Sequence, residues 1–549
     1  MKFPALLLAL LLMACGAVQA QHEHHATQDK GEAALVAGMG SLHHPVSTRN
    51  AEAQRFFDQG LRFVYAFNHE EAVRSFQRAA ELDPSLAMAH WGVAYALGPN
   101  INLDVDPERE KAAFDAVQRA RARSAKASPE ERDYVEALAK RYTDDAGATP
   151  ETLRRLAEDF SRAMGALSKK YPADLDAATL YAESMMNLRP WRLWNKDGTP
   201  AEGTPEIVAT LESVLKRDPN HVGAIHYYIH AVEASPDPGR ALRYAPRLGR
   251  LMPAAGHIVH MPAHIYERTG DYASSARSNE AAAAADRAYI KATGVQGVYP
   301  LMYYSHNLHF LAVAYSMSGR YWDALRSAQQ LEANVAPHLK AMPMLEGFNT
   351  TSTLVLARFR RWDEILKTPE PPAEQAGTRA VWTWARGMAF AATGKTNEAE
   401  AALNSFRSAE QAVPAEMQFG LNKASDILKI ADRTLAARIS VARGERARAA
   451  ELLREAVATE DALAYDEPPA WFLPARETLG AVLLADGRAA EAETVFREDL
   501  KHNPRSGRSL FGLAESLKAQ RKMRAAADAR RQFAAAWKNA DTRLTVVDL

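Results

Sequence analysis

Cysteine is almost absent from this sequence, because the only one among 549 residues is Cys15. A mature chain that lacks this residue has no disulfide, no thiolate metal ligand and no thiol nucleophile. Net charge is absent as well, with 67 Lys+Arg against 67 Asp+Glu. A neutral balance gives no electrostatic reason to expect nucleic acid or an anionic membrane as a partner.

Strand patterns and several catalytic motifs are also missing. Alternating Val, Ile and Thr segments are scarce whereas alanine is abundant, which favours helices. The sequence contains no G-x-S-x-G elbow, Walker loop, G-x-G-x-x-G turn or C-x-x-C-H motif, and so lacks serine-hydrolase, nucleotide-binding and covalent haem signatures. With 47% hydrophobic residues the chain can still bury a sizeable core.

The N-terminus has the layout of an export signal. Lys2 is followed by an apolar run over residues 6–13 that is too short to span a bilayer, and Ala20 ends a small-residue cleavage motif. We therefore expect a signal peptide over residues 1–20 and a periplasmic or secreted mature chain without a transmembrane segment. Two alternatives remain: the segment is retained as an anchor, or residues 12–15 act as a lipobox that leads to lipidation of Cys15, although Met13 is atypical there.

Residues 21–45 form a polar stretch without apolar periodicity, which we expect to be a flexible leader. Its histidines could bind copper weakly near a new N-terminus, but a plain disordered tail is the simpler interpretation. These histidines are His22, His24, His25, His43 and His44.

Repeated marks of helical hairpins begin at residue 53. Gly60 and Ala72 occupy positions 8 and 20 of a 34-residue unit, where small side chains let two helices touch. Phe76 at position 24 fills the space between hairpins, and Pro84 at position 32 ends the second helix. The same positions return near the C-terminus as Gly480, Ala492, Phe496 and Pro504.

These marks resemble the tetratricopeptide repeat (TPR) superfamily over most of residues 53–535. The resemblance implies an all-α, tetratricopeptide-type α-solenoid, a superhelix of roughly ten helical hairpins without a sheet. Residues 67–72, 226–230 and 257–264 are also similar to exported bacterial TPR proteins of unassigned function that carry H-x-x-x-H and H-x-x-H-M-P-x-H motifs. That similarity implies an exported helical scaffold and supplies no substrate.

Breaks rich in proline, glycine or acidic residues divide the repeats into groups. The breaks lie at residues 144–150, 190–205, 293–300, 369–377 and 466–469. We expect N-terminal hairpins over residues 46–143, central hairpins over 150–345, C-terminal hairpins over 346–535 and a tail over 536–549.

Histidines gather on one helix face of the central hairpins. Positions 2, 5, 9 and 12 of the first helix of a repeat share a stripe, which lines the concave surface in TPR superhelices. The motif H-x-x-x-H-x-x-E fills this stripe twice, 34 residues apart. The residues on the stripe are His226, His230 and Glu233, then His257, His260, His264 and Glu267, and finally His306 and His309.

Imidazole and carboxylate groups on adjacent helices are typical of a site for a divalent transition metal such as Zn, Fe, Cu or Mn. We predict that the seven histidines of the stripe are metal ligands. Glu233 and Glu267 would be further ligands, orienting partners or the general base of a hydrolytic or oxidative metalloenzyme that acts on a small molecule or peptide. Two half-sites of equal spacing could hold one ion or a pair.

Interpretations without metal-dependent catalysis stay open. The groove could hold a peptide, a protein partner or a small polar ligand as a non-catalytic scaffold, with the histidines as hydrogen-bonding groups. Loose storage or delivery of metal is a third possibility.

We also make predictions for residues other than the histidines and glutamates of the stripe. Pro262 either kinks the helix that carries the second motif or marks a first turn. Asn279 and Asp286 are expected to be solvated or capping residues on a second helix. Aromatic residues that pack between hairpins or wall a ligand cavity are Trp191, Trp194, Tyr303, Tyr304 and Trp471.

Overall fold

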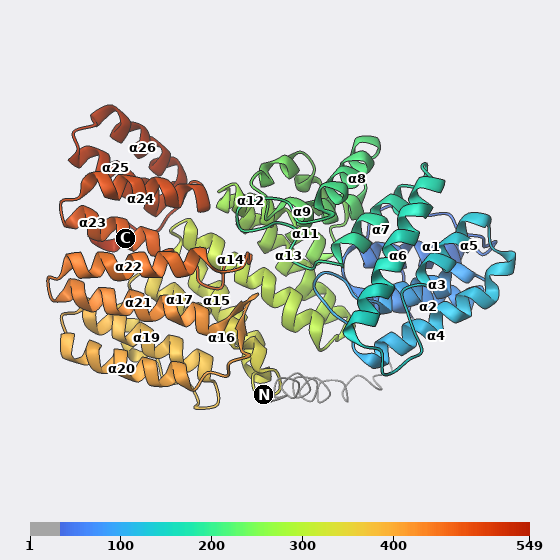
Figure 1. Cartoon of the computed structure of the whole chain (residues 1–549), viewed down its shortest axis with the longest axis horizontal. Helices are drawn as coiled ribbons and strands as arrows, with labels where there is room; N and C mark the ends of the chain where they lie inside the picture. The colour runs from blue at the N-terminus through green and yellow to red at the C-terminus, as the bar shows by residue number, and fades with distance from the viewer. Residues whose placement is uncertain (1–32) are drawn as a thin grey trace, which may run out of the picture.

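The computed structural model describes residues 33–549, so the predicted signal peptide and Cys15 lie outside the described residues. Successive helices pair into antiparallel hairpins that stack along the chain (Figure 1). The sheet content of this range is one short antiparallel pair, β1 (Gln418–Phe419) with β2 (Asn422–Lys423). The fold is an all-α, tetratricopeptide-type solenoid, as predicted, except for this strand pair.

The N-terminal hairpins form the blue and teal end of the molecule (Figure 1). The Asn50 side chain starts the first helix by accepting hydrogen bonds from two backbone N–H groups, and Asn68 starts the second helix with one such bond. The helices are α1 (Ala51–Tyr65), α2 (His69–Leu82), α3 (Ala87–Leu97), α4 (Pro107–Arg123), α5 (Pro129–Leu138), α6 (Pro150–Lys170), α7 (Leu175–Met186) and α8 (Thr204–Arg217).

Phe76 is fully buried between the first helices of two hairpins. A Cβ atom built on Gly60 of α1 would lie 2.6 Å from its ring, and one built on Gly92 of α3 would lie 2.4 Å from it. Only glycine therefore lets the two helices approach the ring this closely. Phe496 repeats the arrangement between two glycines near the C-terminus.

The central hairpins, green to yellow in Figure 1, connect the two ends of the solenoid. The first helix of one repeat is split: α11 ends at His260 and α12 begins at Pro262, since proline is tolerated at a first helical position but not inside a helix. The helices are α9 (Val222–Val232), α10 (Leu248–Leu251), α11 (Gly256–His260), α12 (Pro262–Arg268), α13 (Tyr272–Thr293), α14 (Ser305–Met317) and α15 (Tyr321–Val335).

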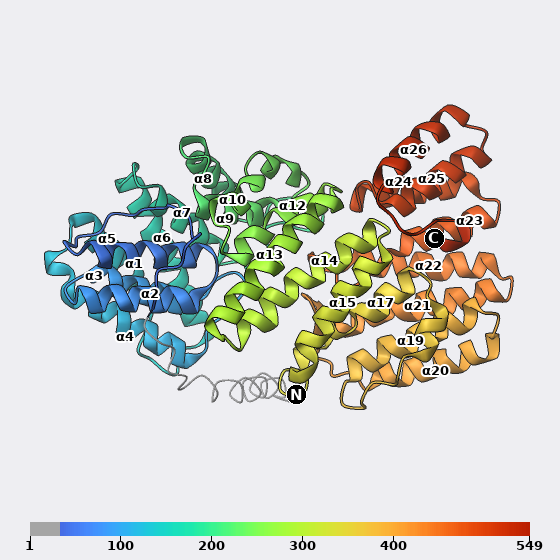
Figure 2. The same cartoon turned by 180° about the vertical axis from the view of Figure 1, so that it is seen from behind.

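The C-terminal hairpins form the yellow to red end, seen from behind in Figure 2. Their helices are α16 (Glu346–Asn349), α17 (Thr351–Arg358), α18 (Trp362–Lys367), α19 (Ala376–Ala392), α20 (Thr396–Gln411), α21 (Ala424–Ala442), α22 (Arg446–Asp461), α23 (Ala475–Ala485), α24 (Ala489–His502), α25 (Gly507–Ala519) and α26 (Met523–Ala536). The tail then turns back, and Asp541 accepts a hydrogen bond of 2.8 Å from the Tyr321 N–H. Within residues 33–549 we find no helix with the length and apolar character that crossing a bilayer requires.

Residues 33–45 are packed, although we expected them to belong to a flexible leader. The Val36 N–H donates to Gln59 at 2.7 Å, the Arg62 guanidinium donates to a carbonyl in this segment, and His44 Nδ1 lies 2.9 Å from Asp176. The segment lacks apolar periodicity, but partners on α1 and α7 satisfy its polar groups. Hydrogen bonds to residues distant in the sequence thus fix the position of a segment whose composition is typical of a flexible one.

His44 gives this segment a pH-dependent contribution to stability. Burial opposes its charged form, but the hydrogen bond and the charge of Asp176 outweigh burial and raise the pKa of His44 to about 9. Hydrogen bonds from His221 and His44 likewise hold the pKa of Asp176 well below its usual range despite burial. Since the pKa of His44 rises on folding, its contribution is fully present below about pH 6.5 and is lost as the pH rises through about 9.

We expect His44→Gln to lower the free energy of unfolding by about 1–3 kcal/mol near pH 6, because a buried charged hydrogen bond is lost. The difference from the unmodified protein should shrink above about pH 9. Urea unfolding of both proteins near pH 6 and above about pH 9 measures this difference in the free energy of unfolding. His43→Gln is the control, because His43 is exposed and its pair with Asp58 contributes less than about 1 kcal/mol. An equal effect of His44→Gln at both pH values would contradict the ionised pair.

Candidate metal centre

Six of the seven predicted ligand histidines meet in the middle of the solenoid. They form two groups of three in which one nitrogen of each imidazole lies within 4.8 Å of the others. Triad A consists of His226, His230 and His257, and triad B consists of His260, His264 and His306. The seventh predicted ligand, His309, belongs to neither triad, and its ring packs against Phe348 and Phe472.

The Nε2 atoms of triad A face one another. Nε2 of His226 lies 3.1 Å from Nε2 of His230 and 3.1 Å from Nε2 of His257. Nitrogen ligands at 2.0–2.1 Å from a common ion are separated by roughly 2.8–3.4 Å in octahedral or tetrahedral geometry. Triad A therefore has the spacing that a transition-metal site requires.

Triad B repeats this arrangement one hairpin further along. Nε2 of His260 lies 2.8 Å from Nε2 of His264, and the centres of the His260 and His306 rings are 4.8 Å apart. The helix break at Pro262 falls between His260 and His264 and still leaves their Nε2 atoms facing each other.

The opposite ring nitrogens of His226 and His260 face hydrogen-bond acceptors. Nδ1 of His226 lies 2.7 Å from the carbonyl oxygen of Tyr65, and Nδ1 of His260 lies 2.7 Å from Oδ1 of Asn279. Carbonyl oxygens only accept, so these Nδ1 atoms carry the proton and the Nε2 atoms present lone pairs. Asn279, which we expected to be solvated or capping, is fully buried and is held in this orientation by donating to the Ser275 carbonyl.

Asp286 also differs from its prediction as a solvated or capping residue. It is fully buried and accepts hydrogen bonds from the Tyr299 hydroxyl at 2.8 Å and from the Asn307 side chain at 2.6 Å. Burial raises the pKa of Asp286 to about 7. A Cβ atom on Gly256 would collide with this carboxyl group, so Asp286 closely supports the start of α11, which carries two of the ligands.

Glu233 connects the two triads. It follows α9, is 1% exposed, and its two oxygens lie 2.8 Å from Nδ1 of His230 and 2.5 Å from Nδ1 of His264. Burial raises the pKa of Glu233, but the two histidines outweigh burial and lower it to about 2. The charge of Glu233 in turn outweighs burial at His264 and raises the pKa of His264 to about 10. Carboxylates placed in this way orient metal-binding imidazoles.

A second carboxylate reaches triad B from the far end of the sequence. Glu467 lies in the loop between α22 and α23, its side chain is 3% exposed, and its Oε2 lies 3.6 Å from Nδ1 of His264. The Tyr465 hydroxyl donates to the same carboxylate. We did not predict Glu467, because its one signal in the sequence is an acidic residue within a proline-containing break.

Glu267, the other predicted acidic residue, is buried near this carboxylate. Within residues 33–549 neither of its oxygens has a hydrogen-bond partner. Burial, reinforced by the charge of Glu467, raises the pKa of Glu267 well above its usual range. An unpaired buried carboxyl group of this kind is costly unless a cation or a proton compensates it.

Five of the six triad histidines are buried and His306 is half-buried, whereas we expected these residues to line a concave groove. Phe67, in the turn between α1 and α2, packs its ring 4.5–5.9 Å from the three rings of triad A. Phe310 on α14 covers triad B at 4.7–5.0 Å. Burial lowers the pKa of every triad histidine except His264. Five of the six imidazoles are thereby kept neutral, as ligands must be.

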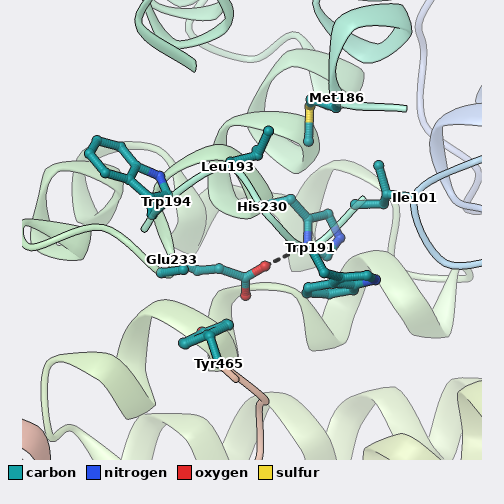
Figure 3. Close-up of a pocket in the computed structure, with 9 residues that line it drawn as sticks. Ile101, Met186, Trp191, Leu193, Trp194, His230, Glu233 and Tyr465 are labelled. Carbon is teal, nitrogen blue, oxygen red and sulfur yellow. Dashed lines mark hydrogen bonds and ion pairs between the residues drawn. The ribbon is translucent and has the colours of Figure 1, made fainter. Parts of the chain in front are cut away.

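A small pocket of about 20 Å³, with room for about one water molecule, lies beside His230 of triad A (Figure 3). His230 and Glu233 lie at its edge, joined by their hydrogen bond, and none of its described lining residues is a lysine or arginine. The Trp194 indole donates to the Ala231 carbonyl at 2.8 Å, which holds the loop before α8 over α9. The remaining lining residues are Ile101, Met186, Trp191, Leu193, Ala234 and Tyr465.

The other aromatic residues with secondary predictions lie apart from this pocket. The Tyr303 ring meets the His257 ring edge-on at 5.0 Å, so it packs on triad A. Trp471 packs against Trp384 at 4.9 Å in the C-terminal core. Tyr304 lines a separate surface groove along α13 and α15.

Comparisons with known proteins add little to this geometry. No protein-family model matches the sequence, and no curated protein does either. Among solved structures, the human IFIT1 dimer with PPP-AAAA is 11% identical, with a TM-score of 0.32 over 89% of this chain and 91% of that chain. The APC/C hetero-tetramer Cut9–Hcn1 is 12% identical, with a TM-score of 0.37 over 90% and 80%, and the P58(IPK) TPR domain is 11% identical, with a TM-score of 0.22 over 86% and 99%. The fold assignment therefore rests on the helical hairpins themselves.

Proposed function

We propose that this chain is an exported solenoid that binds a divalent transition metal through its buried histidine triads. The supporting observation is the proton placement on His226 and His230. Both carry the proton at Nδ1, toward the Tyr65 carbonyl and Glu233, so their Nε2 lone pairs point at each other across 3.1 Å. Neutral imidazoles repel in this arrangement, and a cation between them turns the repulsion into coordination bonds.

The donor set favours a borderline transition metal. Imidazole nitrogens suit Zn, Cu and Fe, whereas Mg and Ca prefer oxygen ligands. Glu233 places a negative charge between the triads, which offsets the cost of burying a divalent cation, and the buried carboxyl groups of Glu267 and Glu467 lie near His264. Phe67 and Phe310 exclude water and so strengthen the electrostatic interactions of the ion.

Three histidine ligands leave a coordination position for water or a small molecule, and metal-bound water is a nucleophile near neutral pH. The pocket beside His230 and Glu233 is lined mainly by apolar side chains and has room for about one water molecule, which favours a very small uncharged molecule over a peptide. We therefore extend the proposal to hydrolytic or oxidative chemistry on such a molecule. In that reaction Glu233 orients imidazoles, and Glu267, whose oxygens are unpaired in the described range, is the proton acceptor.

Elemental analysis of the mature protein, produced without a histidine tag, tests this proposal. We expect at least about one equivalent of a first-row transition metal per chain, since buried multi-histidine sites bind tightly. Removal of the metal with a chelator should lower the free energy of unfolding by about 4 kcal/mol if free metal had been a thousandfold above the dissociation constant. Less than about a tenth of an equivalent, with no response to added metal, would refute metal binding.

A further inference from the structure

The two triads are copies of one arrangement, made by three successive repeats. His226 and His230 recur 34 residues later as His260 and His264, and each pair is completed by a histidine at position 2 of the following repeat, His257 or His306. We propose that the chain holds two ions side by side, one in each triad, and that the two sites differ in affinity. This inference rests on the proposed metal binding.

The six histidines have two focal points. The described ligand nitrogens form two separate groups, and the separations inside a group are 2.8–3.1 Å for the pairs that face each other. Between the groups, the His230 and His264 rings are centred 5.7 Å apart and the His257 and His260 rings 5.9 Å apart. An ion with bonds of about 2.0–2.1 Å can be reached by one group at a time.

Two of the histidines at the boundary between the triads, His230 and His260, cannot be shared between two ions. The second nitrogen of His230 donates to Glu233, and the second nitrogen of His260 donates to Asn279. Each of these two imidazoles thus offers one lone pair, and that lone pair faces its own triad. Each triad supplies three imidazoles, which is the usual protein ligand count of an open metal site, and an ion in triad B displaces a proton from His264.

Glu233 lies where two neighbouring cations would repel. Its two oxygens contact one histidine of each triad, His230 and His264, so its negative charge sits beside both sites. A shared carboxylate of this kind offsets repulsion between the ions and raises the basicity of one ligand in each triad. Removal of its charge should therefore weaken both sites.

Glu467 makes the two sites unequal. It lies 3.6 Å from His264 of triad B, whereas the group that it forms with Glu233 contains no histidine of triad A among the described residues. A second carboxylate on the same imidazole increases its electron donation to a metal. Triad B should thus bind its ion more tightly, and Glu467 acts as a positioning residue supplied by the C-terminal hairpins.

Native mass spectrometry of the full mature chain, titrated with Zn²⁺ alone, tests the inference. We expect two ions per chain at saturation, and one ion in each of the variants His257→Ala and His306→Ala. Glu467→Gln should retain two ions but weaken the tighter site by about tenfold or more, and Glu233→Gln should weaken both by about 10–100-fold. His502→Ala, which removes an exposed histidine, should bind like the unmodified protein.

The outcomes separate this inference from the proposed function. A single ion at saturation, lost in both His257→Ala and His306→Ala, would overturn the two-ion centre and leave metal binding intact. Equal weakening of both sites by Glu467→Gln would overturn the inequality of the sites. No bound ion in the unmodified chain would overturn both proposals, and this measurement does not depend on whether any variant folds.

Discussion

A chain with both His230→Ala and His264→Ala should retain less than about a tenth of an equivalent of transition metal. The double change removes one facing nitrogen from each triad and leaves two imidazole donors in each. It also strips Glu233 of both its histidine partners, so a buried carboxylate is left uncompensated. Metal content after dialysis, measured by elemental analysis, gives the result directly.

The matched control replaces two histidines outside the triads, His338→Ala with His502→Ala. Neither residue belongs to a described group that could hold a metal, so metal content should be unchanged. Circular dichroism on both double variants checks that the helices persist. Metal retention by the His230→Ala, His264→Ala chain at the level of the control would mean that the ion binds elsewhere.

Phe76→Ala should lower the free energy of unfolding of the N-terminal hairpins by about 3–5 kcal/mol. Its ring is fully buried and fills the space between Gly60 and Gly92. Neither glycine has a side chain that could fill the cavity left when the ring is removed. The converse change, Gly92→Ala, overpacks the same contact and should cost about 1–3 kcal/mol. The two changes together should cost less than their sum, because the smaller side chain makes room for the added methyl group.

Hydrogen exchange followed by mass spectrometry localises this effect. Repeats of a solenoid contact mainly their neighbours, so Phe76→Ala should speed exchange in α1–α3 and leave α23–α25 unchanged. Phe496→Ala, the equivalent change near the C-terminus, should show the reverse pattern. Uniform loss of protection along the whole chain in either variant would contradict the independence of the two ends.

The hairpins and the core of the centre could be predicted because their signals are local in the sequence. The positions of Gly60 and Phe76 describe contacts between helices of adjacent hairpins. The i, i+4 spacing of His226 and His230 places both imidazoles on one helix face, and the structure brings their Nε2 atoms within 3.1 Å. The repeat length then places the second pair beside the first.

The enclosure of the centre could not be predicted, because a helix stripe indicates which residues share a face and not what covers that face. The Tyr65 carbonyl that orients His226 is 161 residues away in the sequence. Glu467 arrives from a loop of the C-terminal hairpins, and Phe67 from a turn of the N-terminal hairpins. Residues 33–45 were misjudged for the same reason, since their partners are distant side chains.

His309 shows that a position on the stripe does not by itself place a histidine at the metal centre. It follows His306 by one helical turn on α14, so the two share a face. Its ring nevertheless packs against Phe348 and Phe472, and burial lowers the pKa of His309 to about 4. Shared periodicity therefore predicts neighbours, and the packing of the next hairpins decides which of them reach a common point.

Anomalous X-ray scattering from crystals of the metal-loaded protein, recorded at the absorption edge of the bound metal, tests metal binding by the triads most directly. We expect a peak enclosed by the Nε2 atoms of His226, His230 and His257, and a second among those of His260, His264 and His306. Imidazoles turned away from one another around ordered water, or anomalous peaks confined to surface histidines such as His502, would contradict the metal centre.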